Sequence, residues 1–122
     1  MDIQRYYQKI VESLKLLSLP FDEQIQFFPE YVDVPFEIFD TFEKSFMLLP
    51  QVLESDKITY QAVPNLLRLH NFINMELRNP DFDILEAEKL CNSREWNIIR
   101  ELSKEILELM NEPLSKPNPT YI

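Results

Sequence analysis

The 122-residue sequence contains no glycine, although an average usage of about 7% would supply roughly eight. This absence excludes sites that need glycine where the backbone adopts a positive φ or approaches a ligand closely. Such sites are the dinucleotide-binding GxGxxG turn, phosphate-binding loops, the nucleophile elbow and the EF-hand loop. Two-residue hairpins also lose their preferred residue, so a strand-rich fold is disfavoured.

Histidine and cysteine are equally scarce, with one of each, His70 and Cys91. Neither a catalytic triad nor a four-ligand zinc site can be assembled from them, and a lone cysteine forms no internal disulfide. His70 lies in an apolar helical stretch, where a partly buried imidazole with a hydrogen-bond partner is expected rather than a catalytic base. The D-x-D pair of Asp81 and Asp83 could bind a hard cation, but its place at a helix boundary favours capping. We therefore expect no catalytic residue, no metal and no cofactor.

Apolar residues recur at spacings of three and four through most of the chain, which predicts amphipathic helices, and the nine prolines mark their boundaries. The expected fold class is all-α: a single compact bundle of about five or six helices over residues 1–112. A short, extended, Pro-rich tail at 113–122 is expected to be poorly ordered. The expected helices are 2–18, 22–28, 33–50 with a continuation over 51–55, 59–78, 83–91, and a last helix that begins at Asn92 or Ser93.

Two of these helices carry further expectations about burial. The 59–78 helix is apolar around so much of its circumference that we expect it to be central and most buried. In the last helix, Trp96 and Ile99 belong to the apolar side, whereas Arg100 falls among charged residues expected to face solvent.

The N-terminal residues lack the basic start and apolar run of a signal peptide, and no stretch approaches the ~18 apolar residues of a membrane span. The final four residues contain no lipidation cysteine. We expect the protein to be cytoplasmic.

The negative charge is concentrated in one segment. The net charge is −9, and between Pro20 and Asp56 nine carboxylates accompany a single base, Lys44. The nine are Asp22, Glu23, Glu30, Asp33, Glu37, Asp40, Glu43, Glu54 and Asp56. Glu37 and Asp40 stand close together on a helix, where like charges cost about 0.2–0.5 kcal/mol per pair. Favourable interaction with the helix N-terminus offsets this for Asp33 and Glu37 but not for the others. A functional requirement is one explanation for the excess, and a merely soluble acidic surface is the other.

The same segment holds seven of the nine phenylalanines. Phe39, Phe42 and Phe46 are spaced as a core-facing stripe. Phe28 and Tyr31 belong instead to an aromatic cluster at a proline break, where they either pack back on the core or anchor a protein partner. Acidic and aromatic groups together favour a basic protein partner, and they disfavour nucleic acid and anionic membranes because of charge repulsion. The predicted partner-binding residues are Glu30, Asp33, Glu37, Asp40, Glu43, Phe28 and Tyr31.

Four segments resemble the small acidic, all-α immunity proteins of bacterial contact-dependent growth inhibition and polymorphic toxin systems. They are FMLLPQVL at 46–53, IT at 58–59, LLRLHNFI at 66–73 and EWNIIR at 95–100. The resemblance implies a cytosolic, non-catalytic protein that neutralises one cognate toxin, often a basic nuclease, by covering its active or substrate-binding site. Because contact residues in such proteins diversify with the toxin, it assigns no binding residue.

The charge distribution and the resemblance lead to the same hypothesis, that the chain neutralises a basic toxin through its acidic surface. A nuclease presents positive charge to bind phosphates, so an inhibitor that covers the same surface gains from presenting carboxylates. One alternative is a helical adaptor or regulatory module without a toxin partner. Another is a carboxylate-dependent enzyme, which would require a deep pocket lined by several acids.

Overall fold

A computed structural model describes residues 2–122 of the chain, and within that range it is all-helical, which confirms the expected all-α class. Three helices begin with a side-chain cap, at Asp2, Asp33 and Ser93. Thr59 caps a short 3-10 turn that leads into the fifth helix. The elements are α1 (Ile3–Ser18), α2 (Phe21–Phe27), α3 (Val34–Phe46), α4 (Leu49–Glu54), η1 (Tyr60–Ala62), α5 (Val63–Leu77), α6 (Ala87–Cys91), α7 (Arg94–Leu109) and η2 (Pro119–Tyr121).

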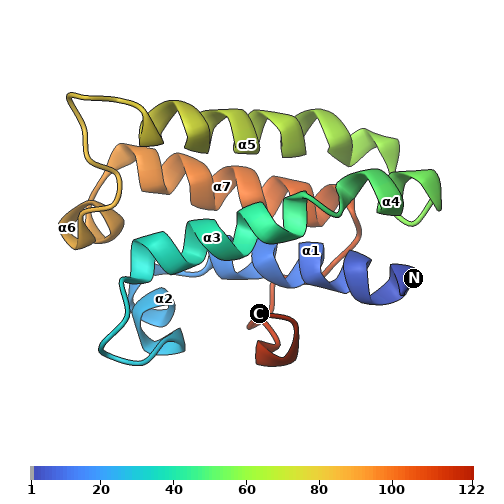
Figure 1. Ribbon diagram of the computed structural model, residues 1–122, viewed down its shortest axis with the longest axis horizontal. Helices are drawn as coiled ribbons and strands as arrows, with labels where there is room; N and C mark the ends of the chain where they lie inside the picture. The colour runs from blue at the N-terminus through green and yellow to red at the C-terminus, as the bar shows by residue number, and fades with distance from the viewer. Residues whose placement is uncertain (1) are drawn as a thin grey trace.

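The four long helices, α1, α3, α5 and α7, lie roughly along the longest axis of the molecule (Figure 1). α1 packs against both α3 and α7, and α5 packs on α7. The short helices α2 and α6 lie at one end of the bundle, and α4 lies at the other end (Figure 1). α3 and α5 are therefore anchored to different partners, α3 to α1 and α5 to α7.

The most buried helix is α1, and the expectation that residues 59–78 would fill this place is wrong. Every residue from Ile10 to Ser18 is buried, including the polar side chains of Glu12 and Lys15. In α5, by contrast, the buried residues are Leu66, Leu69 and Ile73. The reason is position, because α1 is covered by α3, α4, α7 and the C-terminal segment, whereas α5 rests mainly on α7 and η1.

Two helix ends show how the chain manages without glycine. The residues after α4 and α7 that adopt a positive φ are Asp56 (55°) and Asn111 (58°). At each end the next residue donates its backbone N–H to a carbonyl five positions earlier, Lys57 to Val52 at 3.1 Å and Glu112 to Leu107 at 2.9 Å. This is the Schellman motif, in which glycine is the usual residue and Asn or Asp tolerates the left-handed conformation best among the rest.

Arg100 is buried, and the expectation that it would face solvent is wrong. Its guanidinium donates hydrogen bonds to the Leu90 carbonyl at 2.7 Å, to Gln24 Oε1 at 2.8 Å and to the Leu19 carbonyl at 3.1 Å. It thereby joins α7 to the end of α1, to α2 and to α6. Burial lowers the pKa of Arg100, but an arginine remains charged at the pH of any folded protein.

The C-terminal segment, expected from the sequence to be a poorly ordered tail, contacts α1 through Asn118 and η2, whereas residues 113–116 are exposed. The backbone N–H of Asn118 donates to Glu12 Oε1 at 2.7 Å, and Glu12 is only 2% exposed. Pro117 is buried, and η2 contacts α1. The buried carboxylate of Glu12 holds the segment in place, a long-range contact that local composition does not reveal.

Candidate protein-binding site

The acidic residues predicted to bind a partner are carried by α3 and by the loop that precedes it. Asp33 caps α3, since its carboxylate accepts the backbone N–H of Phe36 at 3.3 Å. Pro35 in the first turn suits a helix start, because its fixed φ is helical and it lacks an N–H that would be unpaired there. Asp33 therefore has a structural role that accounts for it without a partner.

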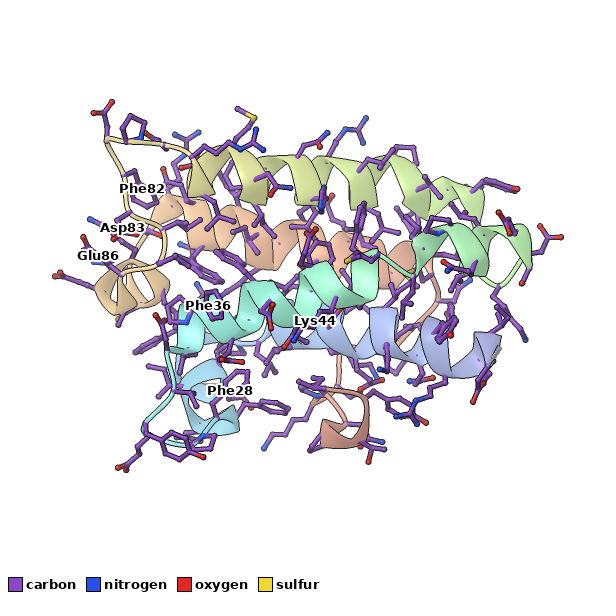
Figure 2. All side chains as sticks on the ribbon, viewed as in Figure 1. Phe28, Phe36, Lys44, Phe82, Asp83 and Glu86 are labelled. Carbon is purple, nitrogen blue, oxygen red and sulfur yellow. The ribbon has the colours of Figure 1, made fainter. Side chains whose placement is uncertain are left out.

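Two of the predicted carboxylates already have positively charged or titratable neighbours. Asp40 pairs with Lys44 at 2.8 Å, one turn along α3. The hydrogen bond to Asp40 and the negative charges of Asp40 and Glu37 raise the pKa of Lys44, which is exposed (Figure 2). Glu43 Oε2 lies 2.9 Å from His70 Nε2 on α5. Within residues 2–122 Glu37 makes no ion pair closer than 4.0 Å.

His70 connects α3 to α5. Its ring stacks on Phe46, with centroids 4.0 Å apart and planes 8° from parallel, while its Nε2 faces Glu43. The imidazole is partly buried and hydrogen-bonded, as the sequence predicts. It forms a bridge between the C-terminal half of α3 and the middle of α5.

Three of the predicted residues, Phe28, Glu30 and Tyr31, lie in the loop between α2 and the Asp33 cap of α3. Phe28 follows α2, packs toward the core and contacts Phe27 edge to face at 5.1 Å. Figure 2 places Phe28 beside α2, below the start of α3. Glu30 is exposed, and Tyr31 is 88% exposed. The structure thus turns Phe28 inward and leaves Tyr31 as the free aromatic of the predicted cluster.

Sequence reasoning missed a groove between α3 and α5, with a volume of about 210 Å³. Its apolar lining comes from both helices and from the loop before α6, and its polar lining comes from Asp40, Glu43 and Asn74. The apolar residues are Phe36, Phe39, Phe42, Ile73, Leu77 and Leu85. Two of them are substantially exposed, Phe36 by 50% and Leu77 by 43%. A signal was present in the sequence, because Phe36, Asp40 and Glu43 follow the four- and three-residue spacing of one helix face.

The groove exists because its walls are held by other elements. Phe39 stacks on Trp96 of α7 with ring centroids 4.6 Å apart, which fixes the α3 wall. The Trp96 indole N–H in turn donates to the Ile84 carbonyl at 3.0 Å, beside Leu85. Ile73 is buried on the α5 side, where α5 packs on α7. These fixed walls leave Phe36 and Leu77 uncovered at the surface.

The carboxylates and the apolar side chains of the groove can together bind a partner group that is both basic and apolar. Among residues 2–122 no group of three or more histidine, cysteine, aspartate or glutamate side chains is placed to hold a metal ion. The groove contains two carboxylates, and a second hollow of about 380 Å³ between α2 and the C-terminal segment contains one, Glu23. A hollow of about 480 Å³ on α7 contains two carboxylates, those of Glu101 and Glu105. None of these three hollows in the described part of the chain is lined by more than two carboxylates. In the described part of the chain no helix is both long and apolar enough to cross a membrane.

Comparisons of the chain with protein-family models, curated proteins and solved structures find no match.

Proposed function

We propose that the protein is an immunity protein that binds a basic bacterial toxin, in particular a nuclease, and neutralises it by covering its active or substrate-binding site. The observation that carries the proposal is the surface of α3, where Asp40 and Glu43 line an apolar groove that the fold leaves open and Glu37 lies one turn before Asp40 on the same helix. The family resemblance in the sequence supplies the identity of the partner, and the surface supplies the physical basis for binding it.

A nuclease attracts phosphates with positive charge, and carboxylates on an inhibitor are attracted to the same surface. Long-range attraction between opposite charges raises the association rate, by roughly 10- to 1000-fold at low ionic strength. Apolar and aromatic contacts in the centre of an interface then slow dissociation. The acidic face of α3 and the neighbouring groove supply these two components side by side.

The proposal predicts that the gene immediately upstream of this chain's gene encodes a toxin domain, and it is tested with that gene's product by co-expression scored for growth and co-purification. The test variant is E37K/D40K, and E105K/E108K on exposed positions of α7 is its matched control. The control has the same residue spacing and changes the net charge equally. We expect the control to protect like the wild type. The α3 variant should lose protection, with an association rate at least about tenfold lower at low salt and a smaller difference at high salt.

Three outcomes are possible. Loss of protection by E37K/D40K with retained thermal stability supports the proposal. If E37K/D40K protects as well as the control and the wild type, the acidic face of α3 is not the toxin-binding surface. Absence of any neutralisation or binding by the wild-type protein would refute the immunity role and favour the adaptor or regulatory module instead.

A further inference from the structure

The groove between α3 and α5 is apolar inside and acidic at its rim. Phe39, Phe42 and Ile73 are 5%, 2% and 5% exposed and belong to the core. Phe36 and Leu77 project at the surface beside them. Figure 2 shows Phe36 near the start of α3, with the loop carrying Phe82 and Asp83 above it. Covering exposed apolar surface releases about 25 cal/mol per Å², so an apolar group of a partner that covers Phe36 and Leu77 contributes to binding.

One end of the groove is limited by the His70 bridge. The other end is the region of Phe36, Leu77 and Leu85. From Phe36 to Glu43 α3 advances seven residues, which corresponds to about 10 Å or two helical turns. This length is too short for an extended helix–helix interface and suits a two-turn segment with one apolar anchor.

The negative charge at the rim of the groove favours a basic partner. Asp40 and Glu43 line the groove, and the whole chain carries a net charge of −9. A second copy of the same chain would bring carboxylates against carboxylates, and nucleic acid or an anionic membrane would be repelled in the same way. A lysine or arginine is attracted, and the planar guanidinium of arginine can donate to both carboxylates.

We infer that this groove receives a short amphipathic helical segment of a basic protein. The segment inserts one bulky apolar side chain between Phe36 and Leu77, above Ile73. A lysine or arginine one turn away pairs with Asp40 and Glu43, where it competes with Lys44 and His70. This is recognition of a helix in a groove, with anchors spaced by three or four residues. The inference rests on the proposed function in that the partner is the toxin.

The first experiment uses a synthetic probe rather than the toxin. The probe is a peptide of about 14 residues, or four turns, built from leucine and lysine in helical periodicity. A peptide of identical composition with strictly alternating leucine and lysine is its control, because it has the same charge but no helical apolar face. Binding to the full chain is followed by amide chemical shifts. We expect the helical peptide to shift residues 36–43 and 70–77 and to bind at least about tenfold more tightly than the alternating one.

A matched pair of leucine variants on α5 tests whether the peptide binds in the groove. Leu77 and Leu67 are 43% and 46% exposed on α5, but only Leu77 lines the groove. We expect L77A to weaken binding of the helical peptide about tenfold and L67A to leave it unchanged. The F36A variant should match L77A. Thermal denaturation of all three variants checks that the fold is retained.

The results distinguish failure of the groove as a helix-binding site from failure of the proposed immunity role. Equal binding of both peptides, or unchanged binding by L77A and F36A, would refute the groove as a helix-binding site. If L77A loses the peptide yet neutralises the upstream-encoded toxin like the wild type, the toxin does not use the groove and the inference fails while the function stands. Groove-dependent peptide binding without any toxin neutralisation supports the groove and refutes the immunity role.

Discussion

Replacing Arg100 with leucine is the sharpest test of how this fold is held together. Arg100 donates to three acceptors contributed by other elements, the carbonyls of Leu19 and Leu90 and the side-chain oxygen of Gln24. Within residues 2–122 it makes no ion pair with a carboxylate. Its interactions are therefore charge-assisted hydrogen bonds from a buried cation, not a salt bridge.

Two opposing contributions set the change in the free energy of unfolding that R100L causes. Leaving a buried acceptor without a donor costs about 1–3 kcal/mol, so three acceptors cost roughly 3–9 kcal/mol. Removing the guanidinium recovers its own desolvation penalty, which is several kcal/mol for a buried ion. We expect R100L to lower the free energy of unfolding by about 2–4 kcal/mol. A chain of this length has a total stability of roughly 6–18 kcal/mol, so the variant folds but is clearly weakened.

The assay is urea denaturation followed by far-UV circular dichroism, with R68L as control. Arg68 is exposed on α5, and leucine and arginine have similar helix propensities, so R68L should change stability by less than about 0.5 kcal/mol. Lysine at position 100 retains the charge but not the planar fork of donors, so R100K should be destabilised as well. A loss below about 1 kcal/mol in R100L would show that the three acceptors find water or other donors, and would refute the reasoning.

Two further predictions concern a helix end and the C-terminal segment. The left-handed conformation of Asn111 suits glycine better, so N111G should raise the free energy of unfolding by about 0.5–1 kcal/mol. Glycine at Asn71, an exposed position inside α5, should instead lower the free energy of unfolding by about 0.3 kcal/mol, the difference between the helix propensities of asparagine and glycine. If chemical denaturation shows that both variants are stabilised, or that both are destabilised, the left-handed assignment of Asn111 is wrong. The Asn118 amide is held by the buried Glu12 carboxylate, so E12A should speed its hydrogen exchange about 10- to 100-fold, as expected for a bond to a charged group. Exchange at Asn118 as slow as in the wild type would show that Pro117 and η2 hold the segment without Glu12.

Local sequence signals predicted the helices and several of their ends. Apolar periodicity and proline positions indicated an all-α chain, and the helix starts at Asp33 and Ser93 follow from side chains that accept backbone N–H groups within three residues. These features depend on neighbours in sequence. For the same reason the spacing of Glu37, Asp40 and Glu43 was enough to place these carboxylates on a single helix, α3.

Contacts between residues distant in sequence decided which side chains and which helix are buried. Arg100 has the helical spacing of a solvent-facing residue but lies where α2 and α6 cover α7. The 59–78 helix has the most apolar residues around its circumference, yet α1 is more buried because more elements surround it. Neither fact is encoded in local periodicity, since burial depends on which elements pack together.

The absence of glycine determined what the protein lacks, and the tertiary structure determined what it offers a partner. Without glycine the chain has no glycine-dependent loop that binds phosphate, and its two left-handed helix ends use Asp56 and Asn111 instead. The carboxylates of α3 could be read from the sequence as a charged helix face. The groove beside them exists only because α3 is held by α1 and Trp96 while α5 is held by α7, which leaves Phe36 and Leu77 uncovered between two fixed walls.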